Sequence, residues 1–251
     1  MSEIEFETRG AVAWIKLNRP EVINAFNAEL LNGLNAAIDR YRDDDTLKVA
    51  VIHGAGERGF SAGVDLKAYA ASLSEGRTSQ EQMNIIRFAD PEYCGKPVVA
   101  AIHGWCVGMG LHLALACDIR VCASDARFAL PEVSIGISIT RLSWQCVHVM
   151  GLPAALELGL LAEKKDAQWA LSNRLVHRVV PVGEELAEAG RLAQRLSQMD
   201  SQAVRVSRQT MYKSLEMNYA QMLKYSLPLR NAVLEGGQDR EAVEAFAHRR
   251  G

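Results

Sequence analysis

Short apolar runs alternate with turn-forming residues along the first two thirds of the chain. Their length and composition are typical of buried strands bounded by turns. Between the first two runs, Asn27 is placed to cap a helix whose apolar residues recur at helical spacing from Leu30 to Ile38. Strand, turn and helix therefore alternate as in an α/β fold. The runs are Ala11–Leu17, Val49–Ile52, Val98–His103 and Ile119–Ala123, with a further apolar stretch, Phe128–Leu130, before Pro131.

The pattern changes toward the C-terminus. From about Ala167 the sequence predicts mainly amphipathic helices, one with its apolar stripe between Leu186 and Leu196. The last predicted helices, around Tyr212–Val233 and Arg240–His248, are too apolar to be solvated on all sides, which favours packing against another subunit. The polar segment Ser72–Gln82 has the composition of a mobile surface loop.

Composition excludes several function classes. The 251 residues are 49% hydrophobic and 23% charged with a net charge of −2, which gives no electrostatic case for nucleic acid. No apolar run reaches about 18 residues without a charge or a break, so no membrane span is expected. Five cysteines without metal-ligand spacing indicate reduced thiols in the cytoplasm, and six scattered histidines suggest no metal site.

The segment Gly104–Asp118 carries the most chemical information. Glycines at 104, 108 and 110 open the backbone just before an apolar helix. A helix start presents N–H groups without intrahelical acceptors at the positive end of the helix dipole, where a developing negative charge can be held. His112 stands alone on this apolar helix, four residues after Gly108.

Several ordered motifs together resemble the crotonase family, also called the enoyl-CoA hydratase/isomerase superfamily. They span nearly the whole chain: LNRPEVINAFN, GFSAGVDLK, AAIHGWCVGMGLHLALACDIRVC, ARFALPEVSIGI and RLVHRVVP. The resemblance implies an α/β fold with a ββα spiral core at residues 1–195 and a helical trimerisation region at residues 196–251. It also implies an acyl-CoA thioester as substrate, with no separate cofactor.

The resemblance places a two-amide oxyanion hole at the N–H groups of Val64 and Met109. The physics agrees, because two preorganised amides can hold a thioester enolate and one such donor contributes about 3–4 kcal/mol. Only the backbone acts, so Met109 is permitted where the family usually has glycine. The plainer interpretation is that both glycine segments are tight turns for close packing.

The family's hydratases carry glutamates at the positions of His112 and Glu132, and here only Glu132 remains. The family's isomerases can work with the later glutamate alone, and burial of a lone carboxyl suits an acid that is also a base. The plainer alternative for Glu132 is a surface residue after a proline turn. His112 is either a second acid/base or orienting group, or a core histidine bonded to a backbone carbonyl.

Two further sets of residues follow from the resemblance. After Glu132 the run Gly136–Trp144 lacks the proline and glycines of the hydratase loop. Arg141 and Trp144 are therefore candidates to line the acyl pocket, although Arg141 alternatively pairs at a subunit interface. Lys67 is a candidate partner for a CoA phosphate or simply a solvated lysine, and Phe246 resembles a position that reaches a neighbouring subunit's CoA site. Predicted CoA contacts are Val22, Asn24, Ala25, Ala62, Val64, Asp65, Leu66 and Lys67.

The sequence thus predicts an enoyl-CoA hydratase/isomerase-type enzyme that uses an oxyanion-stabilised enolate, with Glu132 as acid/base. Another crotonase reaction through His112, hydrolytic C–C cleavage or a lyase reaction, remains open. So does a non-catalytic acyl-CoA binder. The expected assembly is a homotrimer or a dimer of trimers.

Overall fold

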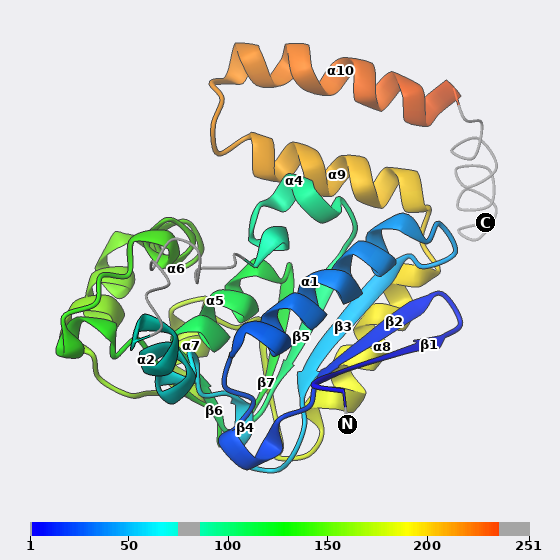
Figure 1. Ribbon diagram of the computed structural model, residues 1–251. Coiled ribbons are helices and arrows are strands. Elements are labelled where there is room, and N and C mark those ends of the chain that lie inside the picture. Colours follow the sequence, from blue (N-terminus) through cyan, green and yellow to red (C-terminus); the bar gives the residue numbers. More distant parts are fainter. Residues whose placement is uncertain (1, 75–85, 236–251) are drawn as a thin grey trace.

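A computed structural model describes residues 2–74 and 86–235, which form two sheets (Figure 1). The larger sheet is parallel except for its first strand, which pairs antiparallel with the second. Its order is β1 (Ile4–Arg9), β2 (Val12–Leu17), β3 (Val49–Gly54), β5 (Val98–Ile102), β7 (Ile119–Ala123) and β10 (Arg178–Val180). The smaller sheet has the order β4 (Gly59–Ser61), β6 (Trp105–Val107), β8 (Arg127–Ala129) and β9 (Lys165–Asp166).

The chain passes through both sheets in each repeat. A strand of the larger sheet leads into a strand of the smaller one and then into a helix, so that parallel neighbours β3, β5 and β7 lie beside parallel neighbours β4, β6 and β8. This is the expected ββα spiral. The helices that close its turns are α2 (Leu66–Ser74), α5 (Met109–Ala116) and, after the 3-10 helix η3 (Glu132–Ile135), α6 (Thr140–Leu161).

Helices cover both faces of the larger sheet, which explains why its central strands read as unbroken apolar runs. The helix α1 (Ala28–Asp43) covers one face, and its predicted cap is confirmed by the 2.7 Å hydrogen bond from the Leu30 N–H to the Asn27 side chain. The helix α8 (Glu185–Ser197) packs on the other face through Ala189, Leu192 and Ala193.

The remaining helices are short or lie at the C-terminal end. They are η1 (Pro20–Val22), η2 (Arg87–Ala89), α4 (Pro91–Cys94), α7 (Ala167–Ser172), α9 (Ser201–Lys213) and α10 (Tyr219–Glu235). Asp118 fixes α9 to the core, because its Oδ1 accepts hydrogen bonds of 2.8 Å from both Arg208 and Tyr212. By contrast, α10 packs mainly on α9 and stands away from the sheets (Figure 1).

The predicted central strands are confirmed, but several bounds were wrong. The edge strands β1 and β10 were missed, because β1 has no buried position and β10 has only three residues, all half-buried. Residues 140–144 belong to α6 rather than to a loop. The predicted helix Tyr212–Val233 is broken between Lys213 and Tyr219, and residues 72–74 close α2 instead of starting a loop.

Some expectations remain predictions. The remainder of the predicted loop, residues 75–82, and the last helix with Phe246 lie outside the described residues. The proposed division after residue 195 falls inside α8, which ends at Ser197.

The segment Leu142–Leu161 of α6 is long and apolar enough to cross a membrane by length and composition. It carries Glu157 and is kinked at Gly151, where φ is +75°, just before Pro153. One side of it, including Cys146, Ala154 and Leu158, belongs to the main hydrophobic core. These are the features of a core helix.

Candidate active site

The glycine turn between β6 and α5 lies directly against Glu132. Gly108 caps α5 with φ +51°, in the region that favours glycine, and a Cβ there would lie 2.5 Å from Glu132 Oε1. Gly63 has φ +92°, and a Cβ on it would lie 2.9 Å from Val107 O and 3.4 Å from Met109 N. The structure therefore brings the two predicted glycine segments and Glu132 to one place, and glycine is required there by space as well as by φ.

Two backbone N–H groups of these segments have no acceptor among the described residues. Val64 forms a parallel bridge with Phe26, in which the neighbours Gly63 O and Asp65 N make the hydrogen bonds, 2.7 and 2.9 Å long. This geometry turns the Val64 N–H away from Phe26. Met109 is the first residue of α5, so its N–H has no intrahelical acceptor. These are the two predicted oxyanion donors.

The predicted CoA-contact residues form one loop pair. Ala62 donates its N–H to Ile23 O at 2.8 Å, which joins the segment after Pro20 to the segment after β4. The Asn24 side chain is fully buried and donates to the carbonyls of Ala55, Gly59 and Phe60 at 3.0–3.2 Å. These bonds hold Asn24 at φ +51°, a strained value for a non-glycine residue.

Arg19 reinforces this loop pair and was not singled out from the sequence. Its guanidinium donates to Ala25 O at 2.6 Å and forms an ion pair with Asp65 at 3.2 Å. Asp65 in turn caps the first turn of α2, accepting from the N–H groups of Lys67 and Ala68. The side chains of Asn24 and Asp65 are thus used within the fold.

The other predicted CoA-contact residues differ in their exposure to solvent. Val22 and Leu66 are 36% and 53% exposed, and Lys67 is exposed at the start of α2. Ala25 is buried. Direct contacts to CoA from this loop pair remain a prediction, and those of Asn24 and Ala25 require the backbone.

Glu132 has the environment of a proton-transfer group. It begins η3 immediately after Pro131, and its Oε2 is buried with no hydrogen-bond partner among the described residues. Burial raises the pKa of Glu132 above its ordinary value, because removal from water disfavours the charged form. Cys146 lies close enough for the Glu132 charge to add to the burial that raises the pKa of its thiol to about 12. The alternative of a surface glutamate is disfavoured.

His112 is buried on α5 and its imidazole is bound by a side chain. Its Nδ1 lies 2.6 Å from Oε1 of Gln145, which is buried on α6. This partner is a side-chain amide, not the backbone carbonyl of the plainer interpretation. Gln145 was missed because it is 33 residues away in sequence and lies in an apolar helix without a recognisable motif.

The two residues proposed to line the acyl pocket begin α6. The side chain of Arg141 lies outside the part of the chain that the structure describes. Trp144 is 40% exposed and its ring lies 4.2 Å from that of His148. Trp144 borders a cavity of about 140 Å³ that neither Val64, Met109 nor Glu132 lines. Its role in the acyl pocket remains a prediction.

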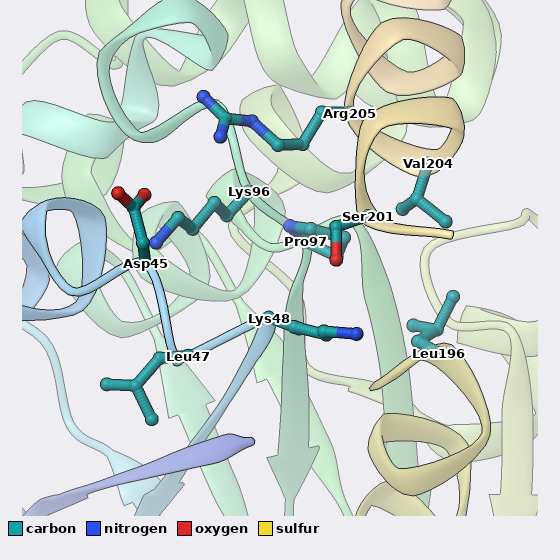
Figure 2. Close-up of a pocket in the computed structure, with 9 residues that line it drawn as sticks. All are labelled: Asp45, Leu47, Lys48, Lys96, Pro97, Leu196, Ser201, Val204 and Arg205. Carbon is teal, nitrogen blue, oxygen red and sulfur yellow. The ribbon is translucent and has the colours of Figure 1, made fainter. Parts of the chain in front are cut away.

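A second cavity, of about 40 Å³, lies away from the glycine turn (Figure 2). Lys96 reaches its wall but donates to the carbonyls of Tyr41 and Asp44, so this cation is used to hold the end of α1. No cluster of three metal-ligating side chains lies among residues 2–74 and 86–235. The cavity is lined by Asp45, Leu47, Lys48, Lys96, Pro97, Leu196, Ser201, Val204 and Arg205.

Comparisons with known proteins identify the family of the chain. The family model for enoyl-CoA hydratase/isomerase matches residues 7–251. The chain is similar to the short-chain-enoyl-CoA hydratase of Clostridium acetobutylicum, with 29% identity covering 100% of this chain and 96% of the relative. It is also similar to the carnitinyl-CoA dehydratase of Proteus mirabilis, with 35% identity over 98% of this chain and 96% of the relative.

Solved structures have the same fold. The enoyl-CoA hydratase of Mycobacterium tuberculosis H37Rv superposes with a TM-score of 0.89 at 30% identity, over 99% of this chain and 97% of that chain. The enoyl-CoA hydratase of Bacillus anthracis gives 0.90 at 26% identity, over 98% and 96%.

Proposed function

The chain belongs to the enoyl-CoA hydratase/isomerase family, and on that premise we propose that it adds water across the double bond of a 2-enoyl-CoA or removes it in reverse. The observation that carries the proposal is the position of Glu132 Oε1 against Gly108, beside the N–H of Met109. A proton-transfer group and an anion-binding amide then face the same reacting segment of a thioester.

The mechanism uses the two N–H groups first. The thioester oxygen lies between the N–H groups of Val64 and Met109, which stabilise the enolate that forms when water attacks Cβ. Glu132, whose pKa is raised by burial, gives its proton to Cα. His112 assists at the water. All of the chemistry proceeds on the coenzyme A thioester itself, without a further cofactor.

The names of relatives favour hydration or dehydration, since relatives are called short-chain-enoyl-CoA hydratase and carnitinyl-CoA dehydratase. The competing proposals are isomerisation by Glu132 alone, C–C cleavage with His112 activating water, and acyl-CoA binding without turnover. Each leaves a different product mass or double-bond position.

A panel of acyl-CoA thioesters of different chain length and polarity tests the function. We expect the purified protein to add 18 mass units to at least one 2-enoyl-CoA, the mass of one water, and to lose them from the matching 3-hydroxyacyl-CoA. Mass spectrometry separates the outcomes: a shifted double bond at constant mass indicates an isomerase, and a shortened acyl chain indicates C–C cleavage. Unchanged masses together with unchanged double-bond positions across the panel would contradict all three reactions and leave acyl-CoA binding without turnover.

We further propose a homotrimer or dimer of trimers assembled through α9 and α10. Apolar side chains on these helices are exposed in the single chain, among them Met211 at 70% and Tyr219 at 79%. Exposed apolar surface of this kind is typical of a subunit interface. The five cysteines are all unpaired and buried, which supports a reducing, cytoplasmic location.

Replacing Leu223 and Leu227 of α10, which are 40% and 48% exposed, by glutamate is expected to convert the trimer to monomers. Two charges at a buried apolar interface cost far more than on a free surface. Light scattering after size-exclusion chromatography measures the mass. Lys224→Glu, an exposed polar position of the same helix, is the matched control and keeps the trimer. A monomeric wild-type protein would overturn the assembly.

A further inference from the structure

The pairing of His112 with Gln145 decides which nitrogen of the imidazole carries the proton. The amide Oε1 carries lone pairs and no hydrogen. At 2.6 Å from Nδ1 it therefore accepts a hydrogen bond from an N–H group at that nitrogen. A neutral imidazole with hydrogen on Nδ1 has its lone pair on Nε2. In this tautomer Nε2 of His112 can take up a proton.

Burial makes this pair costly to break. His112 and Gln145 are 6% and 5% exposed, and a buried polar group left without its partner destabilises the folded protein. Gln145 also borders the cavity of about 140 Å³.

The pair lies beside the proposed acid. Gly108, which touches Glu132, is one helical turn before His112 on α5. Cys146, whose thiol senses the Glu132 charge, follows Gln145 directly on α6. Glu132 itself begins η3, so its links to the pair are Gly108 at the start of α5 and Cys146 on α6.

We propose that Gln145 is a positioning residue that fixes His112 as the Nδ1–H tautomer, which makes His112 the base and leaves Glu132 as the acid. The inference rests on the proposed function. The inference gives each group one direction of proton transfer: His112 takes up a proton and Glu132 gives one. A pair of glutamates has no tautomer that would assign these two roles.

The assignment balances the reaction. In hydration the water oxygen bonds to Cβ and its proton passes to the Nε2 lone pair of His112, while the π electrons move to Cα and the thioester as an enolate. Glu132 then gives its carboxyl proton to Cα. The product has gained one water, and the starting state returns when the imidazolium proton passes to the Glu132 carboxylate.

Nuclear magnetic resonance of the full chain labelled with ¹⁵N-histidine tests the tautomer directly. His112→Ala assigns the resonance. In the wild-type protein we expect Nδ1 to have the ¹⁵N chemical shift of a protonated ring nitrogen and Nε2 that of an unprotonated one. In Gln145→Leu we expect a mixture of the two tautomers. A wild-type spectrum with the proton on Nε2 overturns the proposal. Because this readout needs no turnover, it stands even if the proposed reaction fails.

Kinetics test whether Gln145 acts through His112. Gln145→Leu is expected to lower kcat about 10–100-fold, the usual cost of losing a partner that orients a functional histidine, with KM little changed. In a His112→Ala background the same change should have no further effect on kcat. An equal loss in both backgrounds would mean that Gln145 is merely structural and would overturn the proposal.

Gln145→Glu supplies the conservative variant and covers the case in which Gln145→Leu does not fold. Its carboxylate still accepts the hydrogen bond from the Nδ1–H group, so the tautomer and most of kcat are expected to be retained. The added negative charge favours the imidazolium, which moves the acidic limb of the pH–rate profile to higher pH. Retention of the Nδ1–H tautomer without any movement of that limb would contradict the assignment of His112 as the base.

Discussion

Glu132→Gln is expected to lower kcat on the best acyl-CoA substrate on the order of 10³-fold, within the range that positioned proton transfer contributes. The amide has nearly the same shape but cannot give a proton to Cα. Since Oε2 has no hydrogen-bond partner among the described residues, the substitution breaks no contact there. KM should change little, because the two N–H donors and the loop pair around Asn24 are untouched. Steady-state kinetics with purified protein give both constants.

A surface carboxylate provides the control for this substitution. Glu57→Gln removes one negative charge from an exposed position and should leave kcat unchanged. If Glu132→Gln behaves in the same way, proton transfer by Glu132 is excluded and the enzyme uses another group.

The same variant also reports the protonation state of Glu132 through stability. Burial raises its pKa above the ordinary 4.5, so the folded chain binds the proton more tightly than the unfolded chain. Below pH 4.5 the carboxyl is neutral in both states and carries no penalty. As pH rises through the raised value the wild-type protein loses stability, and Glu132→Gln does not. The difference in Tm between them should therefore grow with pH and then level off; a constant difference would show that burial imposes no such penalty.

Met109→Pro is expected to lower kcat/KM about 10²–10³-fold, the cost of one oxyanion donor. Proline removes the N–H and puts a ring carbon in its place. The fold should tolerate this change, because Met109 is the first residue of α5 and proline is favoured at the first helical position. Circular dichroism and Tm check that the fold is retained before the kinetics are compared.

Met109→Ala is the matched control for the oxyanion donor. It removes the side chain and keeps the backbone N–H, so kcat should stay close to that of the wild-type protein. Any change in chain-length preference then reports how far the methionine side chain narrows the pocket. Equal losses in the two variants would show that the side chain, and not the amide, matters at this position.

Local patterns determined the central part of this molecule. The apolar runs that became β3 and β5 are almost entirely buried, and such strands are recognisable from composition because nearly every position is apolar. The Asn27 cap was also readable, since a helix cap involves only a few consecutive residues. The ordered motifs around Gly63, Gly108 and Glu132 were sufficient for the family.

Other elements gave no such local signal. The edge strand β10 is half-buried, and the helix α6 continues past Gly151 and Pro153, residue types that usually end a helix but here produce only a kink. The role of the Asn24 side chain was also visible only in the structure. Asn24 is one of the predicted CoA-contact residues, but its side chain donates hydrogen bonds to three backbone carbonyls inside the fold.

The resemblance of the sequence to the family predicts that His112 stands where the hydratases carry a glutamate, but it does not say what that histidine does. Only the tertiary structure placed Gln145 of α6 against its Nδ1 and Glu132 against Gly108. The physical reason is that the tautomer of an imidazole and the pKa of a carboxyl depend on the groups packed around them. Those groups come from helices and turns far apart in the chain, and only folding brings them together.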